Sequence, residues 1–151
     1  MAQENGRIVR ALCGAINGRD WDAWRQLLSD DCEWVFVERG ITGGTLRGGV
    51  EVAAAFKQWT TTFPDLRMDI DNLIVAGETV VAEWSARGTQ HGPLKRGEGW
   101  YPATGRSFTR RGCWVAELHG GRIVRFRAYT DAKTLLDQLG LASTTPHLLP
   151  P

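Results

Sequence analysis

The first third of the chain carries apolar residues at helical spacing. A helix is predicted over residues 6–28, because Leu12 and Ile16 recur on one face of it. Residues 17–20 interrupt this pattern, and Asp20 can act as the N-cap of a separate second helix by accepting a backbone hydrogen bond. The pattern therefore favours two helices at the start of the chain.

After the predicted helices, the side chains follow the two-residue period of a strand instead of the helical period. In a strand predicted over residues 32–38, Trp34 and Phe36 lie on one face and Val35 and Val37 on the other. In chain order, the surrounding pattern predicts a turn at residues 29–31, a Gly-rich loop at 40–49, and a third helix at 50–62 that ends before Phe63-Pro64-Asp65.

The second half of the chain is dominated by strands. Four long strands are predicted, at residues 66–76, 80–91, 107–118 and 122–131. Turn signals around Gly77 and Gly120 predict two tight hairpins, and the longer connection over residues 92–106 is rich in Gly and Pro. A last helix over residues 131–139 is expected to end at Gly140.

This order of elements predicts the fold class. Helices followed by a meander of long strands are typical of an α+β protein, and long antiparallel strands twist and curl. We therefore expect a cone-shaped, curved antiparallel sheet wrapped around the N-terminal helices, with one apolar pocket at its open mouth. Residues 1–140 are interpreted as a single domain and residues 141–151 as a flexible C-terminal tail.

The charge and hydropathy of the chain exclude several classes of partner. Its 151 residues include 18 basic and 17 acidic side chains, and the net charge of +1 gives no field to attract nucleic acid or an anionic membrane. No apolar run is long enough to span a membrane. Residues 1–5 lack the start of a secretory signal, so a cytoplasmic location is expected.

The sequence patterns favour chemistry without a cofactor. Neither the three cysteines nor the three histidines are spaced as metal ligands, and the chain has no P-loop and no GxGxxG sequence after a strand. We therefore expect neither a metal ion nor an organic cofactor. The seven Trp residues instead predict a heavy core, an aromatic-lined cavity or a partner interface.

The order of these elements resembles the nuclear transport factor 2-like superfamily, and within it the SnoaL-like polyketide cyclase family. The resemblance extends to Gly140 and rests on five short motifs: RGTQHG at residues 87–92, PATGR at 102–106, GGRIV at 120–124, RAYTD at 127–131 and LDQLG at 136–140. It implies a cone-shaped roll. This scaffold hosts cyclases, isomerases, epoxide hydrolases, dehydratases and plain binding modules, so the resemblance implies the fold more strongly than the reaction.

Some positions depart from the family pattern. Related ester cyclases often have His directly after Gly-Thr, where this chain has Gln90, with His91 next. A step of one residue turns a side chain to the other face of a strand, unless a bulge restores it. The second acid that cyclases often carry three positions before Asp131 is replaced by Ala128. At the positions that a steroid isomerase would need, the chain has Leu12, Phe36 and Cys113, so an isomerase of that kind is rejected.

Asp131 is the first candidate for proton transfer. It ends the last predicted strand on the same face as Arg127 and Tyr129. In an apolar cavity, burial would raise the pKa of this carboxyl toward the range of a general acid or base. Asp131 also precedes the last predicted helix, so a role as its N-cap is an equal alternative.

Three further residues are candidates for the same site. Tyr129 and Arg127 could orient a substrate carbonyl or stabilise an enolate, and His91 could shuttle a proton. The alternative for Arg127 is a structural ion pair with a carboxylate on a neighbouring strand, and for His91 an exposed position in a loop. The sequence favours these alternatives for Arg127 and His91 and leaves Tyr129 open.

Large aromatic residues are expected to line the pocket, although such residues are mostly core by default. Glu38 shares a strand face with Trp34 and Phe36; it is either a second acid near the mouth or a solvated loop residue. Trp100 and Tyr101 could form a flap over the mouth. The residues predicted to bind the substrate are Trp34, Phe36, Glu38, Trp59, Phe63, Trp84, Trp114 and Arg127.

The preferred hypothesis is a cofactor-independent natural-product cyclase. Asp131, with Tyr129 or His91, would close a ring by aldol addition or epoxide opening on an apolar small molecule, such as a polycyclic metabolite. The alternatives are an epoxide hydrolase or isomerase of the same fold, and a non-catalytic small-molecule-binding module. Strands with two apolar faces also predict a homodimer through the outer face of the sheet.

Overall fold

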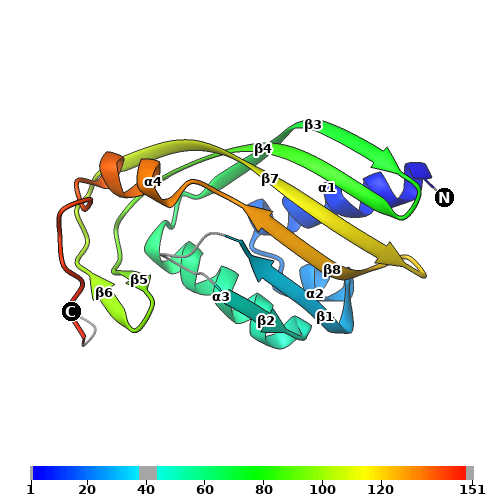
Figure 1. Cartoon of the computed structure of the whole chain (residues 1–151), viewed down its shortest axis with the longest axis horizontal. Coiled ribbons are helices and arrows are strands. Elements are labelled where there is room, and N and C mark those ends of the chain that lie inside the picture. Colours follow the sequence, from blue (N-terminus) through cyan, green and yellow to red (C-terminus); the bar gives the residue numbers. More distant parts are fainter. Residues whose placement is uncertain (1, 38–43, 149–151) are drawn as a thin grey trace.

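A curved sheet forms one layer of the protein, and helices cover one of its faces (Figure 1). The computed structural model describes residues 2–37 and 44–148. In chain order, the elements are α1 (Ala2–Gly18), α2 (Trp21–Gln26), β1 (Leu28–Phe36), β2 (Gly44–Arg47), α3 (Gly49–Thr62), β3 (Arg67–Ala76), β4 (Thr79–Thr89), β5 (Leu94–Arg96), β6 (Gly99–Tyr101), β7 (Ser107–His119), β8 (Arg122–Tyr129) and α4 (Ala132–Leu139).

The large sheet has the strand order β2-β1-β8-β7-β4-β3. β3, β4, β7 and β8 form the antiparallel meander that the alternation predicts. β1 and β8 run parallel, so the sheet is mixed rather than antiparallel throughout. This pairing joins the beginning and the end of the chain, where no hairpin imposes opposite directions.

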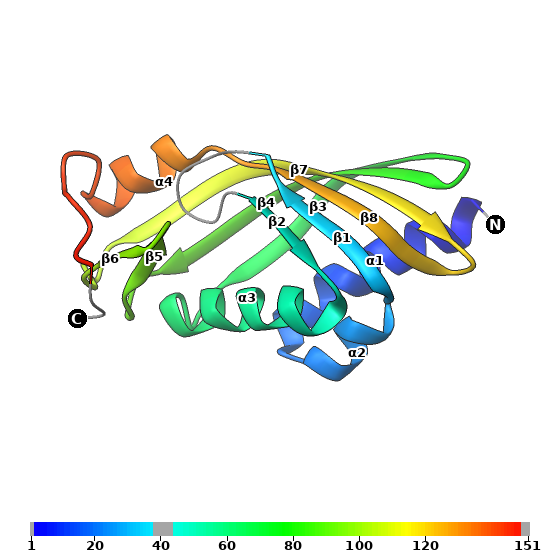
Figure 2. The same ribbon diagram turned by 60° about the horizontal axis from the view of Figure 1, so that its bottom comes forward.

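The helices α1, α2 and α3 lie on one side of the sheet (Figure 2). Asn17, near the end of α1, fixes that helix on β3: its side chain donates to the Met68 carbonyl at 2.7 Å and accepts from the Met68 N–H at 2.8 Å. Asp20 caps α2 by accepting from the N–H of Ala23, which confirms the predicted break between the two helices. α3 packs on α2, β1 and β2.

Three segments predicted as turns or loops contain strands. The turn predicted at residues 29–31 is wrong: β1 already begins at Leu28, which pairs with Ile123 of β8 before the register shifts. Residues 44–47 of the Gly-rich segment form β2 because they pair along β1. The connection over residues 92–106 folds into the β5–β6 hairpin. In each case a distant or adjacent strand supplies the hydrogen bonds that local composition does not reveal.

The segment after α4 returns to this hairpin. α4 ends at Gly140 in the left-handed conformation, as predicted. The backbones of Trp100 and His147 then exchange two hydrogen bonds, with N···O distances of 2.6 and 2.7 Å. A Cβ on Gly99 would lie 2.6 Å from Cβ of Pro146, so the hairpin and this segment are in close contact. The flexibility of residues 141–151 stays a prediction.

The long strands divide their side chains between the helix-covered face and an outer face. Trp84, Trp114 and Phe126 lie on the covered face and are almost fully buried. The outer face carries a continuous run of ion pairs across four strands: Arg47–Glu33, Glu33–Arg125, Arg125–Glu117 and Glu117–Arg127. Charged residues thus occupy part of the expected second apolar face, where Val81 of β4 and Val115 of β7 lie opposite each other. The homodimer remains a prediction.

The α+β class and the curved roll are confirmed. No helix in the described part of the chain is long and apolar enough to cross a membrane. All three cysteines are free thiols. Burial raises the pKa of Cys13 to about 11 and that of Cys32 to about 12, so both behave as neutral, apolar core side chains.

Candidate functional site

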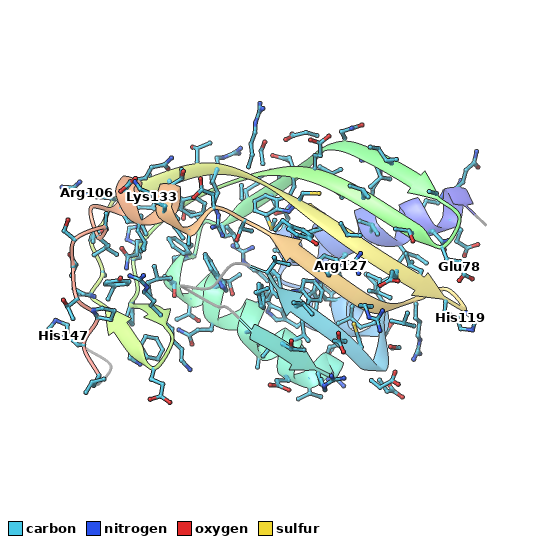
Figure 3. All side chains as sticks on the ribbon, in the orientation of Figure 1. Glu78, Arg106, His119, Arg127, Lys133 and His147 are labelled. Carbon is cyan, nitrogen blue, oxygen red and sulfur yellow. The ribbon has the colours of Figure 1, made fainter. Side chains whose placement is uncertain are left out.

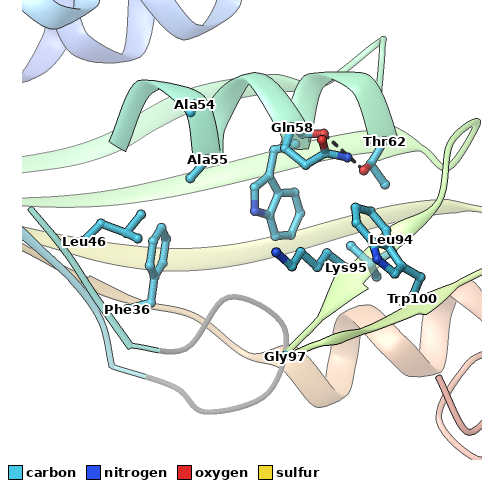
Figure 4. Close-up of a pocket in the computed structure, with 11 residues that line it drawn as sticks. Phe36, Leu46, Ala54, Ala55, Gln58, Thr62, Leu94, Lys95, Gly97 and Trp100 are labelled. Atoms are coloured by element: carbon cyan, nitrogen blue, oxygen red, sulfur yellow. Dashed lines mark hydrogen bonds between the residues drawn. The ribbon is translucent and has the colours of Figure 1, made fainter. Parts of the chain in front are cut away.

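A cavity of about 490 Å³ opens between α3, β2 and the β5–β6 hairpin (Figure 4). Phe36 and Leu46 stand at one end of it, and Leu94, Lys95 and Trp100 stand at the other. This volume lies within the range of roughly 300–1,000 Å³ that is typical of ligand sites. We call this space the outer chamber; it is lined by Phe36, Leu46, Ala54, Ala55, Gln58, Trp59, Thr62, Leu94, Lys95, Gly97 and Trp100.

A second, smaller cavity of about 50 Å³ lies between the sheet and α3. Phe36 and Trp59 line both cavities, so the two spaces adjoin at these rings. We call this space the inner chamber. Its lining residues are Phe36, Phe56, Trp59, Leu66, Met68, Trp84, Ala86, Phe108, Arg110, Trp114, Ala128 and Thr130.

Trp84 takes its position in the inner chamber from the residue opposite it. Trp84 on β4 pairs with Gly112 on β7. A Cβ on Gly112 would lie 2.2 Å from Cζ2 of the indole, so this position can hold only glycine while the ring lies there. The glycine lets the indole lie directly against the neighbouring strand, with Trp114 at 6.0 Å between ring centroids.

Arg110 is the charged residue among the described residues that line the inner chamber. Its guanidinium carbon lies 5.2 Å from the ring centroid of Trp59, 5.8 Å from Phe108 and 5.9 Å from Trp84. Stacking on aromatic faces stabilises a guanidinium that is partly removed from water. Arg110 also lines a hollow on the outer surface together with Asp131.

Polar groups at the outer chamber are few. Lys95 places its ammonium 5.8 Å from the ring centroid of Trp100. The Thr62 hydroxyl donates to the Pro93 carbonyl at 2.8 Å, which ties α3 to the chain just before the hairpin. Gln58 contributes an amide to the α3 side of the cavity (Figure 4). Among the described residues, the outer chamber therefore offers mostly apolar contact, with Lys95 as a cation.

Asp131 does not lie in either chamber. Its carboxylate accepts from the N–H of Thr134 at 3.1 Å and from the Thr134 hydroxyl at 2.6 Å, as the N-cap of α4. These hydrogen bonds lower the pKa of the Asp131 carboxyl. The expectation of a buried acid with a raised pKa is therefore wrong. The N-cap alternative is the one that the structure shows.

Tyr129 and Arg127 lie on the outer face, as their alternation with Asp131 requires. Tyr129 is 42% exposed. The Arg127 guanidinium donates to a Glu117 carboxylate oxygen on β7 at 2.9 Å, which is the structural ion pair that the sequence favoured. Placing Arg127 at the pocket was wrong because β8 turns Phe126 and Ala128, and not Arg127, toward the helices.

Gln90 and His91 are adjacent in the chain but differ in their exposure to solvent. Gln90 is fully buried: its amide donates to the carbonyls of Gly92 and Pro102, and its carbonyl accepts from the Thr104 hydroxyl. His91 is exposed, so no bulge restores it to the pocket. His119 and His147 lie at the two ends of the molecule (Figure 3). The structure thus brings none of the three predicted acid–base residues into the chambers.

The predicted binding residues divide into lining and core. Phe36, Trp59, Trp84 and Trp114 line one or both chambers. Two expectations were wrong: Trp34 and Phe63 are fully buried core residues, stacked on Phe126 and Trp59 respectively. Glu38 lies outside the described residues. Of the predicted flap, Trp100 lines the outer chamber and Tyr101 is fully buried.

Sequence reasoning missed Arg110 and Lys95. A signal for Arg110 was available, because period-two alternation places it on the same face of its strand as Phe108 and Trp114. Lys95 gave no such signal, since the hairpin that presents it is short and rich in glycine. In the described ranges, no group of three or more His, Cys, Asp or Glu side chains could hold a metal ion together.

Comparison with known families decides where this fold belongs. The SnoaL-like domain matches residues 9–126, which is most of the chain. The chain belongs to the SnoaL-like domain family. The family resemblance inferred from the motifs is therefore confirmed, and the SnoaL-like domain contains all of the inner-chamber residues except Ala128 and Thr130.

Three solved structures illustrate what this SnoaL-like protein is similar to. A provisionally named SnoaL-like polyketide cyclase from Jannaschia sp. CCS1 has a TM-score of 0.80 at 20% identity, covering 95% of both chains. TsrD from Streptomyces laurentii has a TM-score of 0.79 at 24% identity, covering 93% of this chain and 98% of its own. AclR, a provisionally named hydroxylase from Streptomyces galilaeus, has a TM-score of 0.77 at 15% identity, covering 93% and 98%.

At these identities the likeness shows the fold alone, and the reactions named for these neighbours differ. No protein among the curated sequences matches this chain.

Proposed function

We propose that this SnoaL-like protein binds a planar, largely apolar small molecule in its two chambers and promotes cofactor-independent ring closure within it. The observation that carries the proposal is a pair of adjoining aromatic-walled cavities with a guanidinium at the inner end. Burying flat apolar surface against such walls is favourable by about 25 cal/mol per Å².

Confinement is the first contribution to the reaction. In an intramolecular aldol addition, a carbon next to one carbonyl gives up a proton to water and bonds to the carbon of a second carbonyl, whose oxygen takes a proton back from water. The product has the same atoms as the substrate, so no co-reactant is needed. A cavity that holds the substrate in a folded conformation keeps its two carbonyl groups close together. The substrate then does not have to search through open conformations, which can lower the barrier by several kcal/mol.

Charge is the second contribution. The intermediate of this reaction carries negative charge on oxygen, and Arg110 supplies a positive charge among aromatic rings. A cation in a site of low dielectric acts more strongly on such an oxygen than it would in water.

The positions of Asp131, Tyr129 and His91 support a second candidate function. These three residues were expected to transfer protons, and all three lie away from the chambers. A binding module that holds an apolar ligand without turnover needs only the cavity. Epoxide opening, hydrolysis and isomerisation stay as other reactions of the same site. The predicted homodimer is also kept as a proposal, and a monomer in sedimentation at micromolar concentration would count against it.

The first test measures binding. Nile red, a neutral planar dye that fluoresces in apolar surroundings, should bind the wild-type protein. Ala55→Trp fills the outer chamber and should weaken this binding by at least about tenfold. Thr61→Trp is the matched control, because Thr61 lies on the same helix but is exposed and lines neither chamber. If the dye binds both variants as well as the wild type, the cavity proposal is wrong.

The second test separates the enzyme from the binding module. An aryl 1,6-diketone closes to a five-membered ring by intramolecular aldol addition, and its product can be followed by chromatography. Ring closure faster with wild type than with Ala55→Trp supports the enzyme. Binding of the diketone with no change in rate supports the binding module instead.

A further inference from the structure

We propose that Trp84 and Arg110 form an oxygen-binding subsite in the inner chamber, which receives a negatively charged oxygen at one end of an otherwise planar, apolar ligand. The ligand class is an aromatic compound that bears a carboxylate, phenolate or enolate. This inference rests on the proposed function, since it assumes that the chambers hold a small molecule.

The indole N–H of Trp84 is the first observation. Trp84 is 2% exposed, and its Nε1 has no hydrogen-bond partner among residues 2–37 and 44–148. A buried donor left without a partner costs roughly 1–3 kcal/mol, so a ligand oxygen that accepts from it would recover this energy. Trp24 and Trp34 have similar buried nitrogens, but neither residue lines a chamber.

The guanidinium of Arg110 is the second observation. Arg110 and Trp84 come from the neighbouring strands β7 and β4. Arg110 pairs with Ala86 of β4, and Trp84 pairs with Gly112, the next residue of β7 on the same face as Arg110. The two side chains approach each other, with the guanidinium carbon 5.9 Å from the Trp84 ring. A guanidinium has five N–H donors, so a contact to the ligand does not exclude contacts to protein groups.

The aromatic surroundings of the guanidinium also favour this role. Arg110 and Asp131 both line the hollow on the outer surface, and the positive charge of Arg110 contributes to the lowered pKa of the Asp131 carboxyl. On its inner side the guanidinium faces the rings of Trp59, Phe108 and Trp84. A ligand anion would therefore meet the cation from the apolar side, where water screens the attraction least.

The sizes of the two chambers fix the orientation of the ligand. The inner chamber holds about 50 Å³, which suits one small polar group, since a water molecule in the liquid occupies about 30 Å³. The outer chamber holds about 490 Å³ and has the space for fused rings. The oxygen-bearing end should thus lie inside and the rings outside.

The experiment compares two probes with the same ring system and opposite charge. Binding of 2-naphthoate and of 2-naphthylmethylammonium is measured by isothermal titration calorimetry. The wild type should bind 2-naphthoate more tightly, by about tenfold or more, because hydrogen bonds to a charged group are the strong ones. Trp84→Phe and Arg110→Met should each remove most of this preference.

Two matched control variants remove the same chemical groups at positions outside the chambers. Arg111→Met removes a guanidinium from the same strand, but Arg111 is exposed and lines neither chamber. Trp24→Phe removes a buried indole N–H that lies outside both chambers. Both variants should keep the preference for 2-naphthoate.

A second measurement uses no variant, so its result does not depend on whether the variants fold. In the wild-type protein, with uniform ¹⁵N labelling, 2-naphthoate should shift the indole N–H resonance of Trp84 downfield, as a new hydrogen bond does. If both probes bind equally and no indole resonance moves, the subsite is wrong while the cavity stands. If neither probe nor Nile red binds, the proposed function itself is wrong.

Discussion

The indole of Trp84 lies across the backbone of Gly112, the residue directly opposite it on the adjacent strand. No side chain fits between them, since a Cβ on Gly112 would come within 2.2 Å of the ring. One glycine on β7 therefore determines where a tryptophan of β4 can lie, and with it the shape of the inner chamber.

Gly112→Ala should displace this indole. The added methyl group overlaps the ring, and overpacking of this kind costs about 1–3 kcal/mol of unfolding free energy. The loss can be measured by guanidinium chloride unfolding. Gly14→Ala is the control: nothing lies within 4 Å of a Cβ there, and replacing a helical glycine should stabilise the protein by about 0.5–1 kcal/mol. Equal stability of Gly112→Ala and wild type would contradict the close contact.

Gln90→Leu should be strongly destabilising. The buried amide of Gln90 joins three parts of the loop region through Gly92, Pro102 and Thr104. Its loss leaves one buried carbonyl and two partly buried groups without this partner, at a cost of about 1–3 kcal/mol. The adjacent substitution His91→Leu, at an exposed position, should change stability by no more than about 0.5 kcal/mol. A similar effect at the two positions would show that the Gln90 network does not hold the loops.

Asp131→Ala should lower stability in a way that depends on pH. Hydrogen bonds from Thr134 lower the pKa of Asp131 in the folded state below its ordinary value of 3.8. The stabilising contribution is therefore fully present above pH 3.8 and is lost as the pH falls through the lower folded value. Unfolding temperatures of wild type and Asp131→Ala should differ near neutral pH and converge in acid.

Asp131→Asn provides the check on this interpretation, because asparagine caps a helix nearly as well as aspartate but does not titrate. It should unfold close to wild type at neutral pH. If it instead behaves like Asp131→Ala at every pH, the carboxylate has a role beyond the cap.

Removal of residues 142–151 should loosen the β5–β6 hairpin. The two backbone hydrogen bonds between Trp100 and His147 disappear with this segment. The Trp100 amide should then exchange with deuterium at least about tenfold faster, because it opens without the rest of the fold. Nile red binding should weaken as well, since Trp100 lines the outer chamber.

Gly99→Ala tests the same contact in the full-length chain, because its Cβ would meet Pro146 at 2.6 Å. It should raise the exchange rate at Trp100 in the same direction. The amide of Val81, in the middle of β4, should exchange at the wild-type rate in both proteins. An unchanged rate at Trp100 would mean that the hairpin holds its shape alone.

The sequence by itself determined the class of fold and most of its elements. Alternation over the four long strands depends on local backbone geometry, and so do the caps at Asp20 and Gly140. The short motifs between residues 87 and 140 likewise indicate the SnoaL-like family to which the chain belongs. These features are readable because each depends on residues close together in the chain.

Only the tertiary structure decided which face of the sheet is covered. Alternation groups Asp131 with Tyr129 and Arg127, and Arg110 with Trp114, but it does not say which group faces the helices. α3 lies against the second group through Trp59, so the predicted acid caps a helix outside and an unpredicted arginine lies within. Burial is a property of packing between distant segments, and no local pattern of residues contains it.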